Sequence, residues 1–418
     1  MAIYLDNPAS TKVCPEAAKA AYLTMTEFFA NPSSPHTAGQ EAERIVKQAR
    51  AQIARSLGVG PQSIVFTSGG TESDNLALLS AFFTAPGSLG GPGGAFKKKA
   101  LLVSTVEHAA VRSAAAYLAE RGVRVKPVAV LPADSAAPGM LDPRSLRDEL
   151  EADTGLVSVM HVNNEIGTIQ PIEEIAGIVK EAATRYSTSI PIHSDAVQSY
   201  GKLPIDAGNG EFRDIDFIAL SAHKIHGPKG VGALYASAPG KLHPMLFGGG
   251  QENGLRSGTE NVPGIAGFAA AAKLMTAEIV GNAKAANTCR RHLLEGLLAE
   301  VPEVVINSPA DASVTGKPGL CSPYILNVSF PGARGEVLVH ELERKGIYIS
   351  TGAACSSQRK EEEAKKDGVL AAIGCPPEVI ASAVRFGFSC YDDPKDMDVV
   401  VQRVKEAALH LRSVGQGR

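Results

Sequence analysis

The chain has 418 residues, of which 44% are hydrophobic and 20% are charged, and its formal net charge at pH 7 is −3. This composition fits an ordinary globular protein with room for two domains, and it lacks the basic excess that a nucleic-acid-binding or membrane-surface protein carries. Because no apolar run reaches about 18 residues, and because residues 1–7 lack a secretory signal pattern, we expect a cytoplasmic protein without a membrane span.

The first half of the chain alternates expected helices with expected strands. We expect helices at residues 15–29, 37–57, 76–83 and 171–186, and strands at residues 63–67, 101–104, 123–130, 156–161 and 215–220. A further buried strand is expected to end at Asp195. This alternation predicts an α/β fold with a mainly parallel sheet between helices.

Residues 68–75 join the strand at 63–67 to the helix that follows it. They read Ser-Gly-Gly-Thr-Glu-Ser-Asp-Asn, and they place a glycine pair, including Gly70, and Thr71 at the start of a helix. Free backbone N–H groups at such a helix start suit a phosphate group. The same residues also fit an ordinary capped turn.

Polar residues follow three other strands. His108 starts the helix after the strand at 101–104, and Asn164 follows the strand at 156–161. Each of these side chains can bind a ligand or only cap a turn. Asp195 supplies the carboxylate that pyridoxal phosphate (PLP) needs beside its ring nitrogen, although an aspartate here can also pair with a lysine or cap a helix. Residues 85–99 form a low-complexity loop that we expect at the surface.

Lys224 lies 29 residues after Asp195 and follows the apolar run at 215–220. The carboxyl ends of such strands hold ligands in open α/β sheets, and a lysine there can form a Schiff base with PLP. The alternative is an ordinary surface lysine. Lys229, in the next turn, is a second candidate but is expected to be a solvated loop residue.

The character of the chain changes after residue 234. A glycine-rich loop spans residues 247–261, a long helix begins near Val262, and strands are expected at residues 325–330, 347–350 and 383–388, with helices at 336–345 and 394–411. We therefore expect a large domain over residues 15–261 and a smaller α+β domain formed by residues 1–14 and 262–418.

Two residues in this second half are candidates for chemistry. Cys355 lies among glycine, alanine and serine residues in a loop after a strand, where its thiolate can act as a nucleophile. Arg385 lies in the last expected strand and needs an anionic partner, such as a substrate carboxylate. The six cysteines contain no Cys-x-x-Cys pair, so no metal or dithiol site is expected.

With these motifs in place, the chain resembles the cysteine desulfurases, which are PLP enzymes of the class V aminotransferase group with fold type I. The most specific matches lie at residues 67–75, 160–167, 222–230, 255–259 and 352–356, and the loop around Cys355 resembles the iron–sulfur-cluster and nitrogen-fixation branch. The chain departs from the family pattern at Ala30, at His226 and over residues 358–368, and the loop at residues 85–99 is extra. These departures leave the identity of the sulfur acceptor open.

The resemblance implies a large PLP-binding domain with a seven-stranded type of sheet, and it implies roles for individual residues. Lys224 is the Schiff-base lysine, His108 stacks on the ring, and Asp195 pairs with the ring nitrogen. The remaining residues implied to bind the cofactor are Gln198 and Asn164 at the ring hydroxyl, Gly70, Thr71, Ser221 and His223 at the phosphate, and Thr259 from the second subunit of a homodimer.

The resemblance also implies a reaction. Arg385, and with it Asn31, binds the carboxylate of L-cysteine, Lys224 moves the α-proton, and Cys355 takes the sulfur as a persulfide while L-alanine leaves. A scaffold protein for iron–sulfur cluster assembly is the implied acceptor. Selenocysteine lyase and class V aminotransferase activities remain alternatives on the same fold, and an assembly role without turnover is the alternative from another class.

Overall fold

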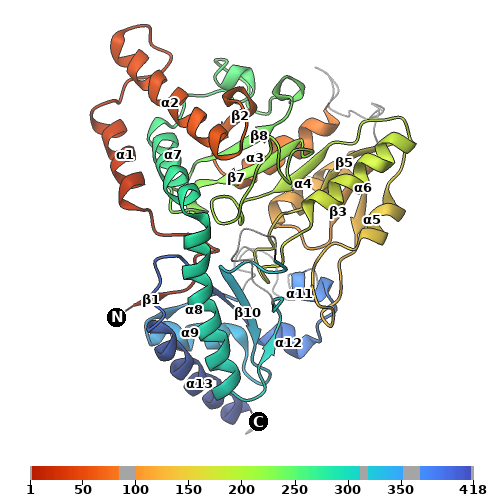
Figure 1. Cartoon of the computed structure of the whole chain (residues 1–418), viewed down its shortest axis with the longest axis vertical. Helices are drawn as coiled ribbons and strands as arrows, with labels where there is room; N and C mark the ends of the chain where they lie inside the picture. Colours follow the sequence, from red (N-terminus) through yellow and green to blue (C-terminus); the bar gives the residue numbers. More distant parts are fainter. Residues whose placement is uncertain (1, 84–99, 311–318, 352–367, 416–418) are drawn as a thin grey trace.

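The computed structural model describes residues 2–83, 100–310, 319–351 and 368–415, which form a larger upper part and a smaller lower part (Figure 1). The larger part contains α1 (Pro15–Thr26), α2 (Thr37–Ser56), β2 (Ile64–Thr67), α3 (Gly70–Phe82), β3 (Ala100–Ser104), α4 (Ala109–Ala119), β4 (Arg124–Val128), α5 (Pro143–Glu149), β5 (Thr154–Ser158), α6 (Ile172–Arg185), β6 (Ile192–Asp195), β7 (Phe217–Ser221), β8 (Gly232–Ala236) and α7 (Val262–Ala277). The smaller part contains β1 (Ile3–Tyr4), α8 (Ile279–Glu300), β9 (Val305–Ile306), β10 (Ile325–Ser329), α9 (Gly335–Arg344), β11 (Ile347–Tyr348), α11 (Val369–Ala372), α12 (Pro377–Ser382), β12 (Ala383–Gly387) and α13 (Asp396–Gly415).

The largest sheet within the described ranges has seven strands in the order β2-β8-β7-β6-β5-β3-β4. Adjacent strands from β7 to β4 are parallel, whereas β8 pairs antiparallel with both β7 and β2. Strands in the middle of such a sheet are covered by helices on both faces, so they read as continuous apolar runs. The seven-stranded, mainly parallel sheet expected from the sequence is confirmed.

Alternation along the strands divides the core into two layers. In β7, Ile218 and Leu220 join the cluster that packs against α1, α2, α6 and α7, while Phe217 joins the cluster against α3 and α4. In β8, Tyr235 and Leu234 divide between the same two clusters. Successive side chains of a strand point to opposite faces, and this rule produces both layers.

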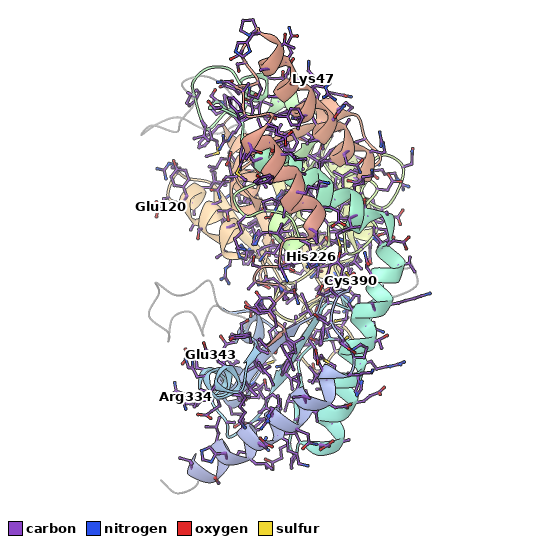
Figure 2. The ribbon with its side chains drawn as sticks, turned by 90° about the vertical axis from the view of Figure 1, so that its left-hand side faces the viewer. Lys47, Glu120, His226, Arg334, Glu343 and Cys390 are labelled. Carbon is purple, nitrogen blue, oxygen red and sulfur yellow. The ribbon has the colours of Figure 1, made fainter. Side chains whose placement is uncertain are left out.

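The smaller part has its own core, built from α8, α9, α13 and the sheets β12-β10-β9 and β1-β11. The β12-β10-β9 pairings are antiparallel, whereas β1 pairs in parallel with β11. The rotated view in Figure 2 places His226 of the larger part and Cys390 of the smaller part in the middle of the molecule, where the two parts meet. A contact of 3.3 Å between the His226 Nε2 and Ser389 Oγ atoms links the parts at this level.

Several element boundaries differ from the sequence expectations. The helix expected over residues 76–83 begins at Gly70, because the polar residues before Leu76 form its first turns, and the helix expected over 15–29 ends at Thr26. The expected long helix after residue 262 is a pair, α7 and α8, with a bend of 79° between them. β1, β8 and α5 were not expected. No single helix of the described chain has the length and apolarity to cross a membrane; the bent α7–α8 pair meets these two criteria only when its helices are combined.

Candidate active site

Three strand ends meet at one edge of the large sheet. β6 and β7 pair in parallel with Asp195 opposite Ala219, so Asp195 and Ser221 end neighbouring strands on the same edge. β2 runs in the same direction as β7, because both are antiparallel to the β8 strand between them, and it leads into Gly70 at the start of α3. Lys224 follows β7 in a short helical turn, Ala222–Lys224. The sheet topology therefore brings these expected site residues together.

A pocket of about 430 Å³ opens at the turn between β2 and α3. The Ser221 Oγ atom is buried there and has no hydrogen-bond partner among the described residues. A Cβ atom on Gly70 would lie 2.6 Å from the Val197 Cγ2 atom, so a larger residue here would force Val197 to shift. The lining residues are Ala9, Ser10, Ser68, Gly69, Gly70, Thr71, Glu72, Ser221, His223, Lys229 and Gly230.

This pocket fits an anion, because an unpartnered hydroxyl and the N–H groups at the start of α3 face the same space. Lys229 is exposed, as expected of a loop residue, yet it also lines the pocket and adds a positive charge. Burial, with a further contribution from Lys224, lowers the pKa of His223 to about 4, so His223 is neutral near pH 7.

Lys224 lies beside the N-terminal segment of the chain. Its Nζ atom donates hydrogen bonds to the backbone carbonyls of Pro8 and Ala9, the latter at 2.9 Å. His223 approaches the same segment, with 3.3 Å between its Nδ1 atom and the Ser10 Oγ atom. These carbonyl contacts hold the Lys224 Nζ atom beside the N-terminal segment of the chain.

Asp195 is buried at the end of β6, where its Oδ1 atom accepts a hydrogen bond of 2.9 Å from the Val197 N–H. Burial is the main cause that raises the pKa of Asp195 to about 6, and the nearby Asp74 carboxyl raises it further. His108 acts in the opposite direction and lowers this pKa. Asp195 is therefore an anion near pH 7 that a cationic partner would stabilise.

His108 is the N-cap of α4. Its Nδ1 atom accepts a hydrogen bond of 3.1 Å from the Ala110 N–H, which fixes the ring at the start of the helix. An accepting Nδ1 leaves Nε2 as the nitrogen that carries a proton. His108 therefore caps the helix, which is one of the two roles that the sequence left open for it.

Arg385 connects three segments that are distant in the sequence. One of its guanidinium nitrogens donates a hydrogen bond of 2.8 Å to the Asn164 backbone carbonyl, and another lies 2.8 Å from the Asp6 Oδ1 atom. The Arg385 Nε atom is buried without a hydrogen-bond partner among the described residues. Arg385 thus has the anionic partner expected of a buried guanidinium and still has donor capacity.

Gln198 donates a hydrogen bond of 2.8 Å from Nε2 to the Pro8 carbonyl, so this carbonyl serves both Gln198 and Lys224. Asp6, Pro8, Ala9 and Ser10 were not expected from the sequence to be site residues. Their residue types gave only a turn signal, and their place in the site depends on the pairing of β1 with β11, which is a contact between distant segments.

Of the expected site residues, Gly70, Thr71, Ser221 and His223 line this pocket, whereas Asn31 and Thr259 do not. Asn31 is exposed, and its Oδ1 atom accepts a hydrogen bond of 2.9 Å from the Ser33 N–H. Thr259 is also exposed and is not among the residues that line the pocket. Cys355 lies outside the described residues, as do residues 85–99, so their expected roles stay predictions.

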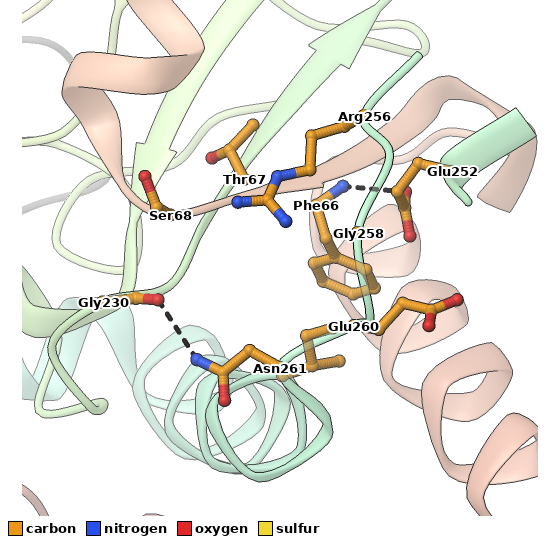
Figure 3. A pocket seen from close by; sticks show the side chains of 10 residues that line it. Phe66, Thr67, Ser68, Gly230, Glu252, Arg256, Gly258, Glu260 and Asn261 are labelled. Atoms are coloured by element: carbon orange, nitrogen blue, oxygen red, sulfur yellow. Dashed lines mark hydrogen bonds between the residues drawn. The ribbon is translucent and has the colours of Figure 1, made fainter. Parts of the chain in front are cut away.

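The loop that carries Thr259 is fastened beside the pocket by two ion pairs. Glu252 binds Arg50 at both carboxylate oxygens and accepts a hydrogen bond of 2.9 Å from the Phe66 N–H (Figure 3). Arg256 pairs with Glu72 at 3.0 Å, and the Glu72 carboxylate accepts the Ser68 N–H at 2.7 Å. The second pair therefore joins this loop to the turn at the anion pocket.

Comparison with known proteins gives consistent results over the whole chain. The family model described as aminotransferase class-V matches residues 3–400. Cysteine desulfurase IscS of Methanosarcina thermophila is 40% identical over 413 residues, which cover 99% of this chain and 93% of that protein. A cysteine desulfurase of Trichormus azollae is 37% identical over 412 residues, with 99% and 94% covered.

Two solved structures are similar in fold and sequence. A NifS-like protein has a TM-score of 0.83 and 34% sequence identity, with 97% of this chain and 99% of that chain covered. The structure of SspA in complex with cysteine has a TM-score of 0.73 and 30% identity, with 94% of this chain and 100% of that chain covered.

Proposed function

Because this chain belongs to the class V aminotransferase family, among its cysteine desulfurases, we propose that it converts L-cysteine to L-alanine and passes the sulfur to Cys355 as a persulfide. One observation carries this proposal: Lys224, Asp195 and the anion pocket meet at one edge of the sheet. The cysteine bound to the similar SspA structure supports L-cysteine as the substrate.

PLP is the cofactor of this family, and the residues at the sheet edge fit it. The unpartnered Ser221 hydroxyl, the backbone at Gly70 and the start of α3 suit the phosphate, together with Thr71 and His223. Asp195 suits the ring nitrogen, because it is a buried carboxylate that a cationic ring would stabilise. When bound, PLP supplies an electron sink for the negative charge that develops at the substrate α-carbon.

The residues of the chain then have separate tasks. Lys224 would hold the cofactor and would then carry the proton removed from the substrate α-carbon. The Asp195 carboxylate would keep the ring nitrogen protonated, and His108 would stack on the ring. Gln198 and Asn164 would bind the ring hydroxyl.

Arg385 binds the substrate carboxylate in this proposal. Its existing contact with Asp6 fixes the guanidinium in place, and the unpartnered Nε–H remains for a second anion. Asn31 is the second residue proposed for this carboxylate. Because Asn31 is exposed in the single chain, this role requires its loop to approach the site when substrate binds.

Cys355 completes the proposed reaction as the nucleophile that attacks the substrate sulfur. The attack breaks the carbon–sulfur bond, leaves an S–S bond on Cys355, and returns the electron pair to the carbon skeleton that is released as alanine. The thiolate form is required, because the protonated thiol is a poor nucleophile. A scaffold protein for iron–sulfur cluster or other thio-cofactor assembly is the proposed acceptor of this sulfur.

The proposal is tested by incubating the purified protein and PLP with L-cysteine and measuring alanine and sulfide. We expect one alanine for each sulfide in the presence of a reducing thiol. Alanine formation that depends on an added keto acid would instead indicate an aminotransferase. Turnover of selenocysteine with none of cysteine would indicate a selenocysteine lyase, and no product from any of these substrates would leave only the assembly role.

The role of Cys355 is tested by mass spectrometry of the protein after incubation with cysteine. We expect the peptide that contains Cys355 to gain one sulfur atom, and we expect Cys355→Ser to bind cysteine without releasing sulfide, because a hydroxyl is far less ionised than a thiol near neutral pH. A sulfur atom found only on Cys375 or Cys390, with Cys355→Ser fully active, contradicts this assignment.

A further inference from the structure

Lys202 is a buried lysine that the proposed reaction does not use. It lies in the turn after β6 with 3% of its surface exposed, and its Nζ atom is 5.6 Å from the centre of the Tyr324 ring of the smaller part. Among the described residues, no carboxylate forms an ion pair with Lys202. A buried ammonium without a carboxylate is costly, so a lysine in this place needs a specific reason.

The groups around Lys202 favour its neutral amine. Burial is the main cause that lowers the pKa of Lys202 to about 7, and the positive charges of Lys224 and Arg385 lower it further. Only Cys390 acts in the opposite direction. The Lys202 side chain therefore lies between the site and the smaller part in surroundings that favour loss of its charge.

One polar contact accounts for the direction in which the Lys202 side chain points. The Lys202 Nζ atom lies 3.3 Å from the Oε1 atom of Gln198, four residues earlier. The Gln198 Nε2 atom donates a hydrogen bond of 2.8 Å to the Pro8 carbonyl, which also accepts from Lys224. The Gln198 amide therefore has a partner on each side.

Lys202 and the Pro8 carbonyl determine which of its two orientations the Gln198 amide adopts. The Pro8 carbonyl can only accept a hydrogen bond, and the ammonium form of Lys202 can only donate one. The neutral amine still donates, and its lone pair is not needed by the Oε1 atom. A reversed amide would place two oxygens against each other at Pro8, and it would place its NH₂ group against a Lys202 that, in its ammonium form, has no acceptor, so the observed orientation is preferred.

From this geometry we infer that Lys202 is a positioning residue, which holds the Gln198 amide so that an N–H, and not the amide oxygen, faces the ring oxygen of the cofactor. The inference rests on the proposed function, because it assumes that Gln198 addresses that oxygen. The Gln198 NH₂ group has two hydrogens, and Pro8 takes one of them. The second is the donor that remains for the cofactor.

A donated N–H has a measurable consequence. It stabilises negative charge on the ring oxygen, which then competes less strongly for the proton that it shares with the Lys224 nitrogen. Loss of the N–H raises the pH at which this proton leaves, and the colour of the bound cofactor reports that pH. One lost hydrogen bond to a charged group corresponds to a shift of about one pH unit.

The experiment measures this midpoint by pH titration of the visible absorption band in the PLP-loaded protein. Lys202→Met removes the donor and keeps the side-chain length, and Gln198→Met removes the amide. We expect each variant to raise the midpoint by about one unit, and we expect the double variant to equal Gln198→Met alone, since Lys202 acts through the amide. Lys180→Met, at an exposed lysine of α6, is the matched control and should not shift the midpoint.

Each other outcome overturns the inference. A Lys202→Met shift that persists in the Gln198→Met background assigns the effect to charge near Lys224. An unchanged midpoint with a lowered melting temperature assigns Lys202 a purely structural role. If Lys202→Met does not fold, a Gln198→Met midpoint that is unchanged or lowered still refutes the donated N–H. A parent protein that binds no PLP and shows no band refutes the proposed function, which is a separate result.

Discussion

Lys224 differs from Lys229, the other lysine of residues 222–230, in the contacts of its Nζ atom. Its Nζ atom is held by the Pro8 and Ala9 carbonyls beside the anion pocket, whereas Lys229 is exposed at the pocket rim. We expect Lys224→Ala to lower alanine formation by about 1,000-fold or more, because both covalent attachment of PLP and proton transfer are lost. Alanine release and the melting temperature are measured together. Full activity in Lys224→Ala, or its loss in Lys229→Ala only, contradicts the assignment.

Asp195 gives a prediction about stability as well as activity. Its pKa in the folded protein is raised from 3.8 to about 6 by burial, so the folded state holds this proton more tightly than the unfolded state does. Stability is therefore unaffected below pH 4, falls as the pH rises from 4 to 6, and stays lower above pH 6. At about 1.4 kcal/mol for each unit, the loss is on the order of 1–3 kcal/mol.

Asp195→Asn cannot ionise and avoids this loss. We expect the cofactor-free variant to be more stable than the parent at pH 8 by on the order of 1–3 kcal/mol, and equally stable near pH 4, in urea unfolding followed by circular dichroism. With PLP and cysteine, the same variant should be at least about 100-fold slower, because the ring nitrogen loses its anion. Equal stability differences at both pH values would show that the Asp195 carboxyl is not ionised in the fold.

At the scale of elements, buried charge helps to hold the loop before α7, beside the apolar packing of Leu255 against the core. The Glu252 side chain is 3% exposed and the Arg50 side chain 19% exposed, so removal of one partner leaves the other charge buried. We expect Glu252→Ala to lower the free energy of unfolding by about 2–4 kcal/mol, because Arg50 and the Phe66 N–H both lose their acceptor. Urea unfolding measures this change.

The matched control for Glu252→Ala is Glu173→Ala. Glu173 pairs with Arg213 at 3.3 Å, but its side chain is 62% exposed. Exposed pairs contribute little, so this variant should change stability by no more than about 0.5 kcal/mol. If the two substitutions have equal effects, burial is not what gives the Arg50–Glu252 pair its importance.

The sequence predicted elements well wherever hydrophobic periodicity or strand composition was strong. α2 shows this, because a helix was expected over residues 37–57 and Ala42, Val46, Ala49 and Ile53 form its buried face at helical spacing. The start of α3 was wrong by six residues, since Gly70 to Asn75 are polar and carry no apolar periodicity, although they are helical. Short strands such as β1 are made by pairing with distant segments, and local sequence does not contain that information.

At the scale of the molecule, the packing supports a domain division that differs from the expected one at residue 262. Val262, Ile265 and Phe268 of α7 belong to the core of the larger part, whereas Ala283 and Leu293 of α8 belong to the core of the smaller part. We therefore propose that the boundary lies at the bend near Glu278. The sequence places one continuous apolar pattern here, and only the 79° bend separates its two halves.

The candidate site was predictable where it depends on strand ends. Asp195, Ser221 and Lys224 follow apolar runs, and the rule that parallel strands present their carboxyl ends at one edge is enough to bring them together. The contacts of Arg385 with Asp6 and Asn164 were not predictable, because they join three segments through the smaller part.

Thr259 raises the remaining question of whether one chain forms a complete site. Its loop is fastened by the Arg50–Glu252 and Arg256–Glu72 pairs, yet Thr259 itself is exposed and does not line the pocket. A rigid loop with an exposed end is suited to reach a neighbouring chain. We propose a homodimer in which Thr259 binds the phosphate in the partner's site, and Thr259→Asp should weaken PLP binding strongly by placing a negative charge beside that phosphate.

Mixed dimers decide between the two arrangements. In a heterodimer of Lys224→Ala and Thr259→Asp chains, a Thr259 that acts across the interface leaves one site with both native residues and the other with neither. A Thr259 that acts within its own chain leaves no site with both. We therefore expect the separated heterodimer to recover about half the alanine formation of the parent, although each variant homodimer is inactive. Inactive heterodimers, or full activity in a protein that light scattering shows to be monomeric, contradict the shared site.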